Sequence, residues 1–252
     1  MRNNAAKGHP IIFSLMLGVV LTLLVSVASA VASIQEFGDM GTRNAQAVAF
    51  LVMAIIVTVY MKRQDPSLVR FGFRKLEALQ ARTVLFYIPM LIIAVAQPIL
   101  SGINREMSAG AVISIVIMTM VVGYTEESIF RGVIRDKLKY KGPVFYIVFS
   151  SVFFGVLHMA NAFSGNDFIH TLLQVANALL LGFVLALLIE AGNNIIPLIA
   201  FHFIYDALAM VSNENLDHEV LIVSILNILY LMYGIYLLVV LTRKHRNHSL
   251  PM

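Results

Sequence analysis

Eight strongly apolar segments, each about 20 residues long, follow one another along this chain of 252 residues. A helix of about 20 residues rises about 30 Å, which matches the hydrocarbon thickness of a bilayer. Hydrophobic residues make up 59% of the sequence and charged residues only 13%, a balance that excludes a water-soluble globule. We therefore predict an all-α polytopic membrane protein with about eight transmembrane helices. The predicted spans are residues 10–33, 44–61, 83–103, 108–134, 143–163, 168–190, 195–212 and 220–241.

Basic residues gather in alternate connections between these spans. They are Arg2 and Lys7 before the first span; Lys62, Arg63, Arg70, Arg74, Lys75 and Arg82 after the second; Arg135, Lys137, Lys139 and Lys141 after the fourth; and Arg243, Lys244 and Arg246 after the eighth. The opposite connections carry only Arg43 and Arg105. Because cytoplasmic loops are enriched in Lys and Arg, both termini are predicted to be cytoplasmic. Topology and contact with the lipid bilayer account for these charges, so no nucleic acid partner is expected.

The first span has one alternative interpretation. Small residues at positions 26–32 follow a basic start and an apolar run, a pattern that resembles the cleavage region of a signal peptide. The apolar run is longer than the usual signal core, and an even number of helices returns the basic tail to the basic side. We therefore expect a retained span.

Ionisable side chains inside the spans are concentrated in the second half of the chain. A charged side chain at the centre of a bilayer costs roughly 2.5 to 3.5 kcal/mol, so each needs a partner or a water-filled cavity. One shared polar site explains the concentration better than scattered charges do. The residues are Glu126, Glu127 and Arg131 in 108–134, His158 in 143–163, and His202 and Asp206 in 195–212; Glu190 and His170 lie near span ends and are expected to be solvated.

Helical spacing assigns different roles to the two adjacent acids. Glu127 and Arg131 are four residues apart, so they share a helix face and are predicted to form an ion pair. Glu126 points about 100° away from that face and is left free. The spacing therefore predicts a structural Glu127 and a reactive Glu126 that faces His158 and His202.

The polar residues of the other two helices also follow helical spacing. His202 and Asp206 are four residues apart, and Phe154 and His158 share a stripe with Asn161. Phe154 is expected to pack, while Asn161 either contacts substrate or bonds a neighbouring helix.

The sequence leaves the need for a metal open. Cysteine is absent, which excludes disulfides and thiolate ligands. The two histidines with Glu126 and Asp206 are candidate ligands for Zn²⁺ with an open position for water. No His-Glu-x-x-His motif occurs, however, and we favour a metal-free site.

Three motifs carry a resemblance to a known family. Glu126-Glu127-x-x-x-Arg131, Phe154-x-x-x-His158 and His202-x-x-x-Asp206 occur in this order in a core at 108–212, between N-terminal helices at 1–107 and a last helix with its basic tail at 213–252. They resemble the motifs of the CAAX protease and bacteriocin-processing (CPBP, or Abi) family of intramembrane endopeptidases, which includes the prenyl-protein type II CAAX endopeptidase.

The eight-helix layout also looks like that of bacterial members, which implies the plasma membrane of a bacterium. The resemblance implies hydrolysis of a peptide bond in a cavity open to the cytoplasm. Glu126 and His158 would activate the attacking water, while His202 and Asp206 would stabilise the oxyanion or help to hold a metal. Asp206 stands where the prenyl-protein endopeptidases have Asn. Because an ionised Asp cannot donate a hydrogen bond, Asp206 must be protonated, must orient His202 or must act as a ligand.

Two other functions agree with the same residues. Buried acids and histidines also form proton or cation pathways in transporters, although no inverted repeat is present. A catalytically silent scaffold or immunity protein is the third alternative. For a protease, the expected substrate is a peptide or a membrane protein.

Overall fold

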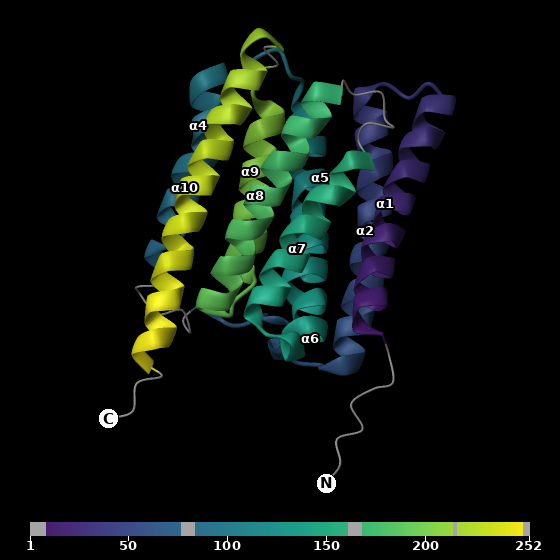
Figure 1. Ribbon diagram of the computed structural model, residues 1–252. Helices are drawn as coiled ribbons and strands as arrows, with labels where there is room; N and C mark the ends of the chain where they lie inside the picture. The colour runs from purple at the N-terminus through teal and green to yellow at the C-terminus, as the bar shows by residue number, and fades with distance from the viewer. Residues whose placement is uncertain (1–8, 77–83, 161–167, 214–215, 249–252) are drawn as a thin grey trace.

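The computed structural model describes residues 9–76, 84–160, 168–213 and 216–248, and these ranges form a bundle of helices without a β-strand (Figure 1). Six helices or helical runs are long and apolar enough to cross a membrane. They are α1 (Pro10–Ile34), α2 (Asp39–Gln64), the run Ala109–Lys141, the run Pro143–Ala160 that contains α7 (Pro143–Leu157), α8 (Phe168–Gly192) and α10 (Leu216–His248). Two shorter apolar helices, α4 (Ile88–Ser101) and α9 (Ile196–Val211), complete the predicted set. The prediction of an all-α polytopic membrane protein is confirmed.

Several helices begin or end at other residues than predicted, because hydropathy does not show where a helix continues into polar residues or stops among apolar ones. The helix α2 begins at Asp39, whose carboxylate lies in the first turn, where the helix dipole favours negative charge. The helix α10 continues from its apolar part into the basic tail. In contrast, α4 is shorter than the predicted span 83–103 and ends before Gly102, which has a φ of +76°.

The helices form a layered bundle in which α5 (Ala109–Glu127) and α8 are central. The helix α5 lies between α2 and α9, and α8 packs against α7 and α10. Residues 184–189 of α8 are buried on every side, as expected for a helix that is apolar all round. Side chains on the outer helices expose large apolar surfaces, which suit contact with lipid.

The predicted span 108–134 is not one continuous α-helix. Ser108 caps the start of α5, where its hydroxyl accepts a hydrogen bond from the amide of Ala111. After Glu127 the chain forms a π-helix, η3 (Ser128–Ile134), then α6 (Arg135–Leu138) and a 3₁₀ turn, η4 (Lys139–Lys141). Hydropathy does not distinguish a π-helix from an α-helix, so the sequence did not predict this segment. Such π segments are frequent at functional sites.

The connection after α2 is anchored to the helices rather than standing away from them. It contains a short 3₁₀ helix, η1 (Val69–Phe71), whose Phe71 is buried. The carbonyl of Gly72, a residue with a φ of +91°, accepts a hydrogen bond from the amide of Ile195 at 2.9 Å. The side chain of Asn194 donates to the carbonyl of Arg74 at 3.0 Å. The predicted basic loop is therefore attached to the turn between α8 and α9.

The two ends of the bundle differ in charge. The start of α1, the end of α10 and α6 all lie at the same end (Figure 1). This end also carries the basic residues of η1, α6 and η4. We refer to it as the basic end.

Candidate active site

A cluster of three carboxylates surrounds the buried side chain of His202 on α9. Nδ1 of His202 lies 2.9 Å from Oε1 of Glu127. Nε2 lies 3.6 Å from Oε2 of Glu126 and 3.4 Å from Oδ2 of Asp206. His202 is 3% exposed, whereas the side chain of Asp206 is 27% exposed. Asp206 therefore forms the open side of the cluster.

Arg131 is the positive counter-charge of the cluster. Its Nη1 donates to Oε1 of Glu127 at 3.0 Å, and its Nη2 donates to the carbonyl of Gly182 on α8 at 3.0 Å. Both side chains of the ion pair are completely buried. The predicted pairing of Glu127 with Arg131 is present.

The two adjacent acids lie on opposite sides of the His202 imidazole. Glu127 holds Arg131, and the same oxygen also accepts a hydrogen bond from His202. The carboxylate of Glu126 approaches Nε2 of His202 from the other side, which is the direction predicted for it. The contact of Glu127 with His202 was not predicted, because it depends on how α9 packs against α5.

The ring of Phe154 on α7 connects the second motif to this cluster. It lies 6.1 Å from the ring of His202 and 4.8 Å from the ring of His158, both in edge-to-face geometry. The guanidinium carbon of Arg131 lies 4.8 Å from the centre of the same ring. Phe154 is therefore a packing residue, as expected, and it is shared by all three motifs.

Backbone and carboxylate acceptors fix the tautomers of both histidines. Nδ1 of His158 lies 2.8 Å from the carbonyl oxygen of Phe154, and a carbonyl can only accept. In neutral His158, Nδ1 therefore carries the proton and Nε2 is an acceptor. The carboxylate of Glu127 selects the same tautomer for neutral His202. Both imidazoles thus present an unprotonated Nε2 when neutral.

Two glycines allow the helices to bring these groups together. A Cβ on Gly123 would lie 3.0 Å from the amide nitrogen of Phe203 and 3.2 Å from the carbonyl of Ile199. Gly123 therefore allows α5 to approach α9 at the level of His202. A Cβ on Gly182 would crowd Phe154 at 3.2 Å and Arg131 at 3.4 Å. Neither glycine was predicted from the sequence, although Gly123 lies one helical turn from the paired acids.

Asn161, a predicted site residue, lies outside the described residues. Glu190 is not simply solvated, because its carboxylate binds Nε of Arg135 at 2.6 Å, at the basic end of the bundle. The other predicted site residues lie in the cluster or against the ring of Phe154.

The side chains of the cluster are of the types that can bind a metal ion. Within the described ranges, no three His, Asp or Glu side chains are arranged to hold a metal ion. Instead, Nδ1 of His202 is occupied by Glu127, and its Nε2 is directed between two carboxylates. The described geometry is that of a hydrogen-bonded cluster, and because a carboxylate on the second ring nitrogen is also common for a metal-binding histidine, the need for a metal stays an open prediction.

The fold and the cluster define a polytopic membrane protein with carboxylate–imidazole chemistry inside its helical core. Residues 108–208 match the model of one protein family, which is described as type II CAAX prenyl endopeptidase Rce1-like. This match confirms the resemblance to the CAAX protease family and supports an intramembrane protease of that general type. The comparison with curated proteins gives no match.

Proposed function

We propose that this chain is an intramembrane endopeptidase in which Glu126 is the general base. The observation that carries the proposal is the position of Glu126, 3.6 Å from Nε2 of His202 in the buried helical core. A carboxylate with a fixed imidazole neighbour and little competing water is suited to move protons. The match of residues 108–208 to the CAAX endopeptidase family supports peptide-bond hydrolysis as the reaction.

In the proposed reaction, Glu126 and His158 hold the attacking water. The unprotonated Nε2 of His158 accepts one hydrogen bond from the water, and Glu126 takes the other proton as the oxygen attacks. A carbon–oxygen bond forms while the carbonyl π electrons move to the oxygen. When the tetrahedral intermediate collapses, the carbon–nitrogen bond breaks and Glu126 returns its proton to the leaving amine. The products are a carboxylic acid and an amine, and transfer of the acid proton to the amine gives a carboxylate and an ammonium group.

His202 and Asp206 are proposed to stabilise the oxyanion together. Neutral His202 donates through Nδ1 to Glu127, so its Nε2 has no proton for an oxyanion. One further proton shared between Nε2 and the carboxylate of Asp206, 3.4 Å away, supplies the donor. This role explains how an Asp can stand where the prenyl-protein endopeptidases have Asn.

The test of the general base compares the peptides in membranes from cells that carry wild-type protein, Glu126→Gln or Glu106→Gln. Glu106 is exposed in the connection before α5, so the control makes the same chemical change outside the site. Products present with wild type should fall by about 10² to 10⁴-fold with Glu126→Gln and persist with Glu106→Gln. Equal expression of all three proteins is checked by immunoblot. Unchanged peptides with Glu126→Gln would rule out this proposal and favour a scaffold or a transporter.

The role of Asp206 is tested with two variants of similar size, one that can donate a hydrogen bond and one that cannot. The amide of Asp206→Asn donates a hydrogen bond without first being protonated, as the carboxylate must be. Asp206→Leu has no hydrogen-bond donor. We expect Asp206→Asn to retain cleavage and Asp206→Leu to lose about 10²-fold or more. Loss of cleavage in both variants would mean that the carboxylate itself is needed, either to orient His202 or as a ligand.

A further inference from the structure

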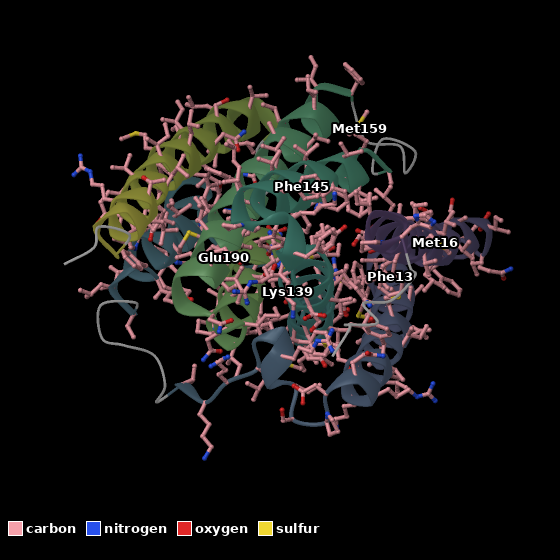
Figure 2. The ribbon with its side chains drawn as sticks, turned by 60° about the horizontal axis from the view of Figure 1, so that its bottom comes forward. Phe13, Met16, Lys139, Phe145, Met159 and Glu190 are labelled. Atoms are coloured by element: carbon pink, nitrogen blue, oxygen red, sulfur yellow. The ribbon has the colours of Figure 1, made fainter. Side chains whose placement is uncertain are left out.

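The basic end of the bundle contains a cavity separate from the carboxylate–imidazole cluster. Its volume is about 310 Å³, which is at the lower end of the range for small-ligand sites. Figure 2 shows Lys139 and Glu190 near the middle of the face that it opens on. The connection after α2, the segment from α6 to the start of α7, and the end of α8 all contribute to its wall. The charged lining residues are Arg70, Arg74, Arg135, Asp136, Lys139 and Glu190.

Ion pairs inside the cavity leave an excess of positive charge. Asp136 is shared, because Nε and Nη2 of Arg70 bind it at 2.9 and 2.7 Å while Nζ of Lys139 binds it at 2.6 Å. Arg135 is neutralised by Glu190 at 2.6 Å. The exposed Arg74 has no ion-pair partner among the described residues. Four cations thus face two carboxylates, and the cavity has a net charge of +2.

Several donors in the cavity have no protein acceptor. In the described part of the chain, Nη1 of Arg70 and Nη2 of Arg135 make no hydrogen bond, since only their other nitrogens are engaged. The guanidinium of Arg74 is wholly available, and its backbone is fixed because Asn194 donates to its carbonyl. Asp136 and Glu190 therefore hold Arg70 and Arg135 in place, and each of these guanidinium groups keeps a nitrogen that can still donate to a ligand.

We infer that this cavity binds a phosphate group. A planar guanidinium matches phosphate oxygens with paired donors, and an excess charge of +2 balances a phosphate monoester. The same chemistry occurs in the headgroup of an anionic phospholipid and in a soluble phosphorylated molecule. The site uses neither Glu126 nor His202, so the inference goes beyond the proposed protease function and does not rest on it.

The experiment titrates the purified full-length protein and detects bound ligand by native mass spectrometry. Dioctanoyl phosphatidic acid is the probe, and dioctanoylglycerol, which lacks only the phosphate, is the matched ligand control. Arg74→Gln removes the unpaired cation, whereas Arg63→Gln removes an equal charge from the last turn of α2, outside the cavity. Gel filtration checks that both variants are folded. A separate titration with inorganic phosphate tests the soluble source.

We expect wild type and Arg63→Gln to bind phosphatidic acid alike and Arg74→Gln to bind it roughly tenfold more weakly, the loss typical of one charge-assisted hydrogen bond. Dioctanoylglycerol should not bind at the site. Inorganic phosphate should compete with phosphatidic acid, and absence of competition would overturn the inference. Equal affinity for inorganic phosphate and phosphatidic acid would identify a soluble phosphorylated ligand, whereas tighter binding of phosphatidic acid would identify a lipid headgroup. An equal loss in Arg63→Gln and Arg74→Gln would overturn the inference, because general attraction would then explain the binding. Unchanged binding in Arg74→Gln would overturn it as well.

Discussion

At the residue scale, the most demanding feature is a guanidinium buried inside a membrane protein. Arg131 has no exposed surface, and its partners are Glu127, the carbonyl of Gly182 and the ring of Phe154. Removal of one partner from a buried ion pair leaves an uncompensated charge, which is more costly than removal of both. Arg131 is therefore a structural requirement of the cluster as well as its counter-charge.

The first prediction concerns this pair. Arg131→Met should destabilise the folded protein by about 3 to 5 kcal/mol, because Glu127 then remains buried without its counter-charge. The double variant Glu127→Leu/Arg131→Met should regain part of this stability, although it also loses the hydrogen bond to His202. Thermal unfolding of the purified proteins measures both effects. Arg105→Met, at an exposed position outside the cluster, is the control. A single variant as stable as wild type would contradict a structural role for the ion pair.

Residue spacing predicted part of this site and could not predict the rest. The ion pair between Glu127 and Arg131 lies within one helical turn, so its geometry follows from the sequence. The contact of Glu127 with His202 joins two helices, and it depends on a close approach that no spacing within one helix encodes. For the same reason the donation from Arg131 to Gly182 was not foreseen.

At the element scale, the distance between α5 and α9 determines whether the carboxylates reach His202. Backbone atoms of α9 lie at 3.0 and 3.2 Å from the place where a side chain on Gly123 would begin. Helices that meet across a glycine approach more closely than helices that meet across larger residues. The position of this glycine, opposite Ile199 and Phe203, sets the spacing at the site.

The second prediction uses two glycines on the same span. Gly123→Ala should push α9 away from α5, lengthen the contact between Glu126 and His202, and reduce cleavage by about tenfold or more, because small displacements of catalytic groups are costly. Gly132→Ala is the matched control, since its Cβ would meet no atom closer than 3.5 Å. The measurement is the rate of release of a product peptide identified in the membrane comparison. Equal activity of the two variants would show that the glycine contact does not set the site geometry.

The presence of each helix was easier to predict from the sequence than its length or its internal geometry. Long apolar runs predicted every helix of the membrane bundle because a helix is the structure that satisfies its own backbone hydrogen bonds in lipid. The π-helix η3 was not predicted, since it depends on packing around Arg131 and its neighbours and changes no apolar pattern. The shorter length of α4 was also not predicted, because apolar residues continue through its ends.

At the scale of the whole molecule, charge asymmetry predicts the orientation in the membrane. The ends of α2 and α10 and the segment α6 to η4 are basic and lie together, whereas the connection between α1 and α2 lies at the opposite end of the bundle (Figure 1). Positive charge is retained on the cytoplasmic side of membrane proteins. The basic end is therefore predicted to face the cytoplasm.

The third prediction tests this orientation directly in the natural sequence, which has no cysteine. Gln35→Cys follows α1 at the opposite end, and Gln64→Cys ends α2 at the basic end; both positions are exposed. A maleimide that cannot cross membranes should label Gln35→Cys in intact cells and should label Gln64→Cys only after the cells are opened. The reverse pattern would contradict cytoplasmic termini.

The π-helix η3 changes the rotational phase between the two parts of one membrane span. The residues before it, Glu126 and Glu127, are oriented by their contacts with α9, while the residues after it, Arg135 and Asp136, are oriented by the cavity at the basic end. In an uninterrupted α-helix, rotation of one set would rotate the other by the same angle. The wider turn of η3 absorbs the difference. The wider turns of η3 therefore set the angle between the carboxylates that face His202 and the residues that line the cavity at the basic end.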